Sequence, residues 1–236
     1  MAHKIKKTEG GAHIFILGMC VFILVFFIMI TAYWEMVANA SYEKIDSAVT
    51  NSLLSSLIPN IELTYSSSTG TGIIISSTDY ANTGDIGSIR NDPSLDRCYE
   101  RFLSSLKTNL NLNDSLQSNN PMLHGNVTVQ FLRLYEVKRL VSGGFRVTQY
   151  YCSNGTWILE KILDGPDMPV ITIHSTWDGE TKVLEKTSIE ASLELRLYTR
   201  ANGKQLHEAG TDLEEVTTFV NYHRMAQITD YEIEKW

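Results

Sequence analysis

The sequence predicts an α+β protein in which a long N-terminal helix precedes a domain built from a helix packed on a mainly antiparallel β-sheet. Three observations support this fold class. An uninterrupted apolar run occupies Ile14–Ala32. Apolar residues recur at helical spacing after Pro93, and from Gly125 onward they alternate with polar residues, as they do in half-buried strands.

The apolar run is long enough to cross a membrane. Its 19 residues cover about 28 Å as a helix, close to the ~30 Å hydrocarbon thickness of a bilayer. Tyr33 and Trp34 follow it, where the aromatic residues of a membrane interface are expected. We therefore predict a stub over 1–12 and a transmembrane helix over 13–34.

The lysines predict the orientation of this helix. Lys4, Lys6 and Lys7 precede the apolar run, whereas Lys44 is the only basic residue between the run and Arg90. Because positive charge favours the cytoplasmic side, we expect the stub inside the cell and the rest of the chain outside. The predicted location is the cell membrane, with a single pass and an extracellular C-terminal domain.

Two alternatives exist for the fate of the apolar run. Ala38-Asn39-Ala40 forms a small-residue pattern at which a signal peptidase could cut before Ser41. The run is longer than an ordinary signal sequence, and the pattern lies several residues beyond it. Retention as an anchor is therefore the favoured interpretation.

A second helical segment over 35–58 continues directly from the first. It contains no proline or glycine and ends before Pro59. Its apolar residues form a narrow stripe that could pack on the protein's own domain or on partner helices. The residues of this stripe that we predict for helix packing and assembly are Met36, Val37, Ile45, Val49 and Leu53.

The remaining residues, 59–236, are predicted to form the extracellular α+β domain. Short strands are expected over 61–65 and 72–76, followed by an exposed loop over 77–91 that either contacts a partner or is a solvated linker. Pro93 suits the first position of a helix. The apolar face of that helix comprises Leu95, Tyr99, Phe102, Leu103, Leu106 and Leu110.

Several strands are predicted in the second half of the chain. A change of parity after Phe131 indicates a bulge, and Asn154-Gly155 indicates the turn of a hairpin. Residues 188–199 alternate most regularly, which predicts a strand with one buried and one solvated face. Further strands are expected over 170–177 and 216–228. A turn at 201–203 is expected to follow the strand over 188–199.

Charge and motifs exclude several classes of function. The chain holds 20 basic and 27 acidic residues, which disfavours nucleic acid as a partner. It carries no hydrolase, nucleotide-binding or zinc-protease motif, and the histidines are scattered, so we predict no enzyme, cofactor or metal site. Two acidic runs could ligate calcium but lack the spacing of a calcium-binding loop, and solvated acidic loops are favoured: Asp164 with Asp167, and Asp212 with Glu214 and Glu215.

Two of the three cysteines fall in the predicted outer domain. Cys20 lies in the apolar run and is interpreted as a small apolar residue. Cys98 and Cys152 are a disulfide candidate, because an oxidising compartment permits such a bond. Pairing requires spatial proximity, which the sequence does not settle.

The overall plan and one local block resemble a known family. Residues 99–116, YERFLSSLKTNLNLNDSL, followed by Gly125-Asn-Val-Thr-Val129, resemble the helix-then-strand block of TadE-like, membrane-anchored minor pilins of Gram-positive tight-adherence or competence-type pilus machinery. A basic stub, a membrane helix and a trailing α+β domain match the wider pilin-like plan. The resemblance implies other pilin-like subunits or pilus assembly proteins as partners.

One residue of the type IV pilin pattern is missing. Pilins carry a glutamate five residues after the cleavage point, but cleavage after Gly11 or Gly10 would place Ile16 or Phe15 there. This difference favours a minor or accessory component over a major subunit. The alternative is a membrane-anchored binding or sensing domain with no role in a pilus.

Overall fold

The computed structural model describes residues 6–57, 86–90, 93–139, 143–166, 170–172, 181–184, 186–199 and 203–227 of the 236-residue chain. The strands predicted over 61–65 and 72–76 lie outside these residues, as does most of the loop predicted over 77–91.

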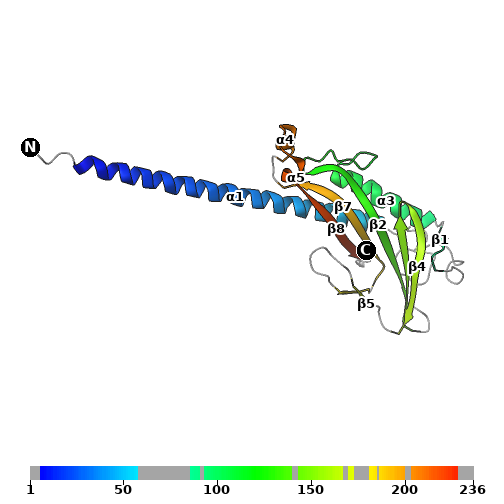
Figure 1. The fold of residues 1–236 in the computed structure, drawn as a ribbon. Helices are drawn as coiled ribbons and strands as arrows, with labels where there is room; N and C mark the ends of the chain where they lie inside the picture. The colour runs from blue at the N-terminus through cyan, green and yellow to red at the C-terminus, as the bar shows by residue number, and fades with distance from the viewer. Residues whose placement is uncertain are drawn as a thin grey trace, which may run out of the picture.

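A single helix, α1, dominates the shape of the molecule. It runs without interruption for 51 residues, Lys6–Ser56. Its first half projects from the domain and its second half lies within it (Figure 1). The predicted transmembrane and amphipathic segments are therefore two parts of one helix, as their direct continuity in sequence indicated.

The domain is built on one antiparallel sheet of six strands, in the order β1-β4-β3-β2-β7-β8. A separate pair, β5 and β6, forms a small two-stranded sheet. The strands are β1 (Ile89–Arg90), β2 (Leu123–Arg139), β3 (Phe145–Ser153), β4 (Thr156–Gly165), β5 (Val170–Thr172), β6 (Thr181–Val183), β7 (Ser188–Tyr198) and β8 (Thr217–Gln227). Helices and an antiparallel sheet together confirm the predicted α+β class.

The second long helix, α3 (Pro93–Leu110), lies beside the inner half of α1 on the same face of the sheet (Figure 1). It begins at the predicted Pro93. The predicted face of α3 is buried or half-buried, with Phe102 and Leu106 fully enclosed. Both helices and strands β2, β3, β4, β7 and β8 contribute to one apolar core.

Local sequence signals place two irregularities of the sheet correctly. Asn154 and Gly155 adopt positive φ angles of 49° and 79°, which suit the tight turn joining β3 to β4. The register between β2 and β7 shifts at His124/Thr128 and again at Val129/Phe131. The second shift is the predicted bulge, and it moves Leu132 and Leu134 onto the helix-covered face.

Strand β7 differs from its prediction. Ile189, Ala191 and Leu193 face the helices as expected, but Glu190 and Ser192 on the opposite face are also buried. Glu190 pairs with Met225 of β8, which packs on a second, smaller apolar cluster on that face, where Leu184 after β6 meets residues of β2 and β3. The Ser192 hydroxyl donates a hydrogen bond to the side chain of Gln130 at 2.6 Å. The predicted solvated face is therefore wrong for the first half of this strand.

Two further segments contain more structure than the sequence indicated. Ile89 and Arg90, within the loop predicted over 77–91, pair with Ile158 and Trp157 of β4. Of the turn predicted at 201–203, residues 201 and 202 lie outside the described residues, and Gly203 begins a short helix, α4 (Gly203–Glu208). A second short helix, α5 (Leu213–Val216), follows, so that β8 begins at Thr217. Of the strand predicted over 170–177, residues 170–172 are described and form β5.

Candidate membrane segment and packing surface

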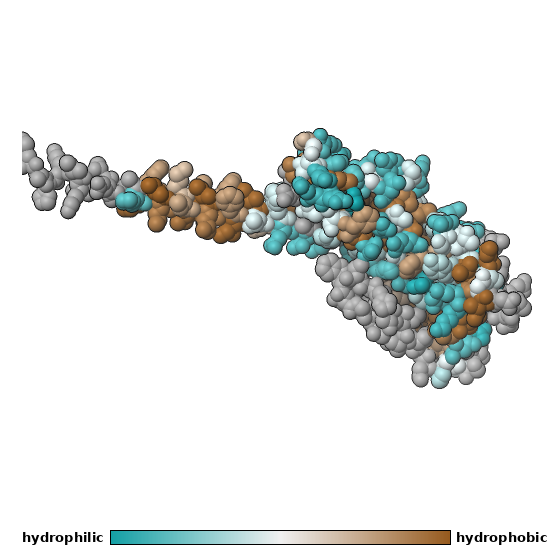
Figure 2. Space-filling view, in the orientation of Figure 1, coloured by the Kyte–Doolittle hydropathy of each residue, from teal (hydrophilic) through white to brown (hydrophobic). Residues whose placement is uncertain are grey.

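The outer half of α1 is apolar on every side. Its large apolar side chains between Ile14 and Met29 are exposed, with exposed fractions from 45% for Ile23 to 74% for Ile14, and Ile30 is half-buried. Because consecutive helical residues point about 100° apart, an unbroken run of them leaves no polar face. Figure 2 shows apolar side chains covering the projecting rod. Within the described residues, one helix, α1, is long and apolar enough to cross a membrane.

Thr31 shows how the segment satisfies a polar side chain without solvent. Its hydroxyl lies 2.9 Å from the carbonyl oxygen of Ile28 and 3.2 Å from that of Phe27. A hydroxyl that donates to its own helix leaves no polar group requiring water, which is the condition for a helix in hydrocarbon. The local geometry is therefore compatible with a membrane interior.

The predicted packing stripe divides between solvent and the protein's own core. Met36 is 62% exposed and Val37 is half-buried, whereas Ile45, Val49 and Leu53 are at most 2% exposed. The last three pack on the domain, which was the alternative for this stripe. An assembly role for Met36 and Val37 stays a prediction.

The helix enters the domain at Ser41, which is 8% exposed. From Tyr33 to Ser41 the helix rises about 12 Å. This short rod separates the apolar segment from the domain, and Glu35, Met36, Asn39 and Ala40 are exposed along it. The apolar stretch of α1 and the stretch that packs on the domain therefore do not overlap.

Polar contacts fix the inner half of α1 against α3. The Asn109 side-chain amide donates to the Ser52 hydroxyl at 3.2 Å and approaches the Ala48 carbonyl oxygen at 3.4 Å. The Ser52 hydroxyl in turn donates to Ala48 at 2.7 Å. These bonds satisfy a fully buried serine between two helices and set their relative position along the axis.

Asp46 fixes the same half of α1 against β8. Its carboxylate accepts from the Tyr222 hydroxyl and from Nε of Arg224, and the Arg224 guanidinium also forms an ion pair with it. In the sequence Asp46 belongs to the polar side of the helix, and no periodicity indicates a partner 178 residues away. A charge at the edge of an apolar stripe is a signal that could have indicated such an anchor.

A polar cluster lies on the sheet face opposite the helices. Arg133 Nε donates to Glu160 at 3.1 Å, the Tyr135 hydroxyl donates to Glu190 at 2.8 Å, and Gln149 donates to Glu160 at 2.6 Å. Burial, followed by the nearby charge of Glu190, raises the pKa of Tyr135. Both carboxylates are engaged by donors, so this cluster has the character of a structural network.

Two of the scattered histidines meet where β2 begins. The rings of His124 and His207 lie 5.5 Å apart, and Nδ1 of His124 lies 3.0 Å from the Tyr198 hydroxyl oxygen. Burial, together with the charges of His207 and Arg196, lowers the pKa of His124. His174 lies outside the described residues. His207 is half-buried at this contact.

One aspartate of each acidic run has a structural partner, and Asp167 lies outside the described residues. Asp164 accepts two hydrogen bonds from Arg146, at 2.7 and 2.8 Å. Asp212 caps α5 by accepting from the backbone N–H of Glu214 at 3.2 Å. Glu214 and Glu215 occupy the first turn of α5, where acidic residues suit the helix dipole. No group of three or more potential metal ligands occurs among the residues that the structure describes.

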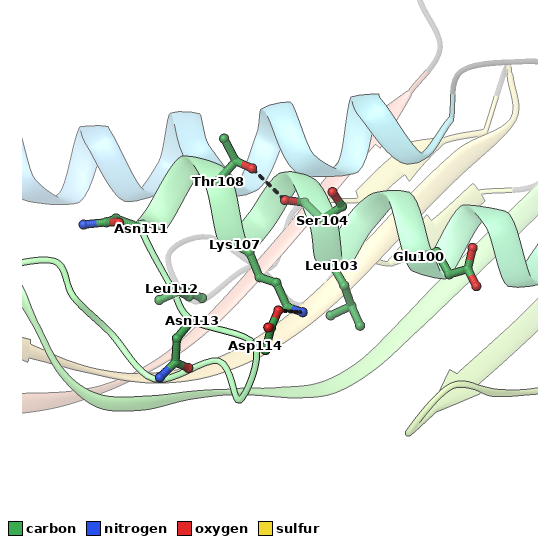
Figure 3. A pocket seen from close by; sticks show the side chains of 9 residues that line it. All are labelled: Glu100, Leu103, Ser104, Lys107, Thr108, Asn111, Leu112, Asn113 and Asp114. Carbon is green, nitrogen blue, oxygen red and sulfur yellow. Dashed lines mark hydrogen bonds and ion pairs between the residues drawn. The ribbon is translucent and has the colours of Figure 1, made fainter.

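A hollow of about 760 Å³ lies beside the end of α3 (Figure 3). Lys107 reaches across it to Asp114, with Nζ 3.2 Å from Oδ1. Glu100 is the other ionisable residue of its lining, which is otherwise composed of polar and aliphatic side chains. The hollow is open, and its cation is already paired, so it offers no arrangement of acid, base and nucleophile.

Cys98 and Cys152 are brought into the same core. They are 2% and 1% exposed, on α3 and β3 respectively, and are present as two separate thiols. Cys20 lies in the apolar half of α1 and is exposed. The disulfide between Cys98 and Cys152 stays a prediction.

Comparisons with known proteins add no relative to this description. No protein-family model matches the chain, and neither a curated protein nor a solved structure matches it.

Proposed function

We propose that this protein is a single-pass membrane protein with its N-terminus in the cytoplasm and its α+β domain outside the cell, acting as a minor or accessory pilin-like component of a pilus or secretion apparatus. The observation that carries the proposal is the division of α1. One half is a bare apolar rod and the other half is part of the domain core.

The physical argument begins with the cost of exposing the rod to water. Exposed apolar surface costs about 25 cal/mol per Å², so an all-apolar segment of about 28 Å would drive aggregation in solution. A bilayer removes this cost, as would neighbouring helices of the same kind. The lysines before the segment support a cytoplasmic stub.

The rigidity of α1 supports a structural role. Because the helix continues from the apolar segment into the domain without a break, the domain is held at a fixed distance and angle from that segment. Such coupling suits a protein that positions its domain beside other subunits. Met36 and Val37, together with the apolar run, are the part of the helix available to partner helices.

Photo-crosslinking in living cells tests the assembly role. A photoreactive residue at Met36 is expected to form adducts with other pilin-like subunits, identified by mass spectrometry. Leu54 is the matched control, because it is 40% exposed but lies on the half of α1 that packs on the domain. Adducts with lipid alone at Met36, and a gene neighbourhood without a secretion ATPase and a polytopic platform protein, would contradict the role.

The second candidate function is a membrane-anchored binding or sensing domain without a pilus role. The specific observation in its favour is that Ile45, Val49 and Leu53 are buried in the domain core. Only a short part of the apolar stripe is then left for contacts with other subunits. The missing glutamate near Ile16 favours it as well.

Mass analysis of the mature N-terminus distinguishes the forms of the protein. A start at Met1 or Ala2 indicates a retained anchor, and one at Gly11 or Ala12 indicates prepilin-type processing. A start at Ser41 indicates a secreted domain and would overturn both membrane-anchored functions.

A further inference from the structure

The two cysteines of the domain meet at a junction of three elements. Cys98 lies on the buried face of α3, and the side chain of Ser56, at the end of α1, forms a hydrogen bond with its thiol. Cys152 lies on the helix-covered face of β3, where the backbone amide of Gly155 forms a hydrogen bond with its thiol. Both are members of the same core cluster.

Contacts on either side of the pair show that α3 and β3 approach closely there. Tyr99, next to Cys98, has its ring against the turn after β3, such that a Cβ atom on Gly155 would lie 3.2 Å from the ring. Cys152 interacts electrostatically with Cys98, Asp96 and Tyr99, which all lie in the first two turns of α3. The two thiols therefore lie near each other at the boundary between helix and sheet.

We propose that Cys98 and Cys152 form a disulfide that joins α3 to β3, and that this bond forms while the chain folds in an oxidising compartment. The bond would close a loop of about fifty residues that includes most of α3 and the whole of β2. This disulfide does not depend on any role in a pilus. Its formation in cells does require the proposed location of the domain outside the cell.

The chemistry is a thiol–disulfide exchange with an external disulfide, supplied by a thiol oxidoreductase or a small-molecule disulfide. The thiolate of one cysteine attacks that disulfide, which forms a mixed disulfide and releases one external thiol. The second cysteine, as a thiolate, then attacks the sulfur of the first, which closes the bond and releases the second external thiol. Two protons and two electrons leave the protein thiols, and the external disulfide is reduced.

Burial determines when this exchange can occur. Burial raises the pKa of the Cys98 thiol from 9.0 to about 12, and that of Cys152 likewise to about 12. The folded, reduced protein therefore holds far less thiolate at neutral pH than an unfolded chain. An external disulfide also cannot reach side chains that are at most 2% exposed. Closure must precede completion of the core.

Differential alkylation of the full-length chain tests the bond. Membranes are acid-quenched, denatured and treated with N-ethylmaleimide without reductant, and the peptides are identified by mass. We expect Cys20 to carry the label, whereas Cys98 and Cys152 are recovered as one linked peptide pair that takes up two labels after reduction. Label on Cys98 and Cys152 without reduction, or a bond to Cys20, would overturn the proposal. A Cys20→Ala variant should retain the linked pair.

A second measurement tests the order of events and separates this proposal from the membrane topology. The reduced chain in detergent micelles is exposed to oxidised glutathione, either folded or during refolding from denaturant. We expect closure during refolding to be much faster than in the folded protein, because the folded core both withholds the thiolates and keeps out the external disulfide. Equal rates of disulfide closure in the folded and the refolding protein would contradict the proposal that the bond forms before the core is complete. If the disulfide closes in micelles but Cys98 and Cys152 are free thiols in cells, the disulfide does not form in cells. The proposed outer location of the domain would then be wrong.

Discussion

Val25 and Val49 lie on the same helix, yet Val25 is 47% exposed and Val49 is fully buried. The local backbone is helical at both positions, and both belong to apolar patterns. What differs is the neighbourhood: solvent surrounds the first, whereas the second belongs to the core cluster, in the half of α1 that contacts α3, β7 and β8. The two halves of one continuous helix can therefore require different surroundings.

The comparison also shows where stability is expected to reside. The outer half of α1 makes no contribution to the core cluster, whereas the inner half supplies Ile45, Ala48, Val49 and Leu53 to it. Substitutions in the outer half should alter membrane insertion and leave domain folding unchanged. The same substitutions in the inner half should unfold the domain.

The largest effect is expected from an aspartate in each half. Val49→Asp buries a carboxylate without a partner and should destabilise the domain by more than about 4 kcal/mol. Val25→Asp should leave the melting temperature of the domain in detergent unchanged, but should cost about 2.5–3.5 kcal/mol in membrane insertion. Circular dichroism and membrane fractionation measure the two outcomes. Equal thermal stability of the two variants would contradict the division of α1.

A smaller effect is expected from truncating adjacent leucines. Leu53→Ala empties a fully buried position and should destabilise the domain by about 2–5 kcal/mol. Leu54→Ala, at a position that is 40% exposed, should change stability by less than about 0.5 kcal/mol. Denaturant titration of the two variants compares them directly. If Leu54→Ala lowered the free energy of unfolding as much as Leu53→Ala, the assignment of which face of α1 packs in the core would be wrong.

The ion pair between Asp46 and Arg224 should contribute still less. Asp46→Asn removes the charge while keeping the shape, and we expect a loss of about 1 kcal/mol, because the two side chains remain 35% and 40% exposed. The matched control is Asp114→Asn, whose fully exposed carboxylate pairs with Lys107. Both variants are measured by thermal unfolding. A greater loss at Asp114 than at Asp46 would show that the contact with β8 does not hold α1 in place.

The smallest effect is a dependence on pH at the end of the sheet near α4. The pKa of His124 is lowered by burial and by the charges of His207 and Arg196. The unfolded chain therefore binds this proton more readily, so the contribution to stability is present above pH ~6.5 and is lost as pH falls through the lower pKa of the folded state. Melting temperatures from pH 7.5 to 5 should fall less steeply in His124→Gln. An identical slope would exclude His124 as the source.

The sequence alone predicts those parts of the fold that local chemistry determines. Pro93 at the start of α3, Asn154-Gly155 in the β3–β4 turn and the change of parity after Phe131 each act within a few residues, and each was placed correctly. The apolar run before Tyr33 belongs to the same group. Such signals need no knowledge of distant partners.

What the sequence could not supply depends on contacts between distant elements. The point at which α1 becomes buried, Ser41, is set by α3 and β8, because the apolar stripe itself continues across that point. Burial of Glu190 depends on Arg133 and Tyr135 and on the second apolar cluster, in which Leu184 after β6 packs with residues of β2 and β3. The approach of Cys98 to Cys152 is likewise a product of the tertiary fold.

Cysteine labelling of intact cells tests the central claim, that α1 spans the membrane and carries the domain outside. Single cysteines replace Lys4 in the stub and Glu208 on α4, which is exposed, in a Cys20→Ala background, and a membrane-impermeant maleimide is added. We predict that the cysteine at position 208 is labelled at once, and that the one at position 4 reacts only after the membrane is permeabilised. Labelling in the reverse order, or recovery of the chain in the soluble fraction after alkaline carbonate extraction, would contradict the account.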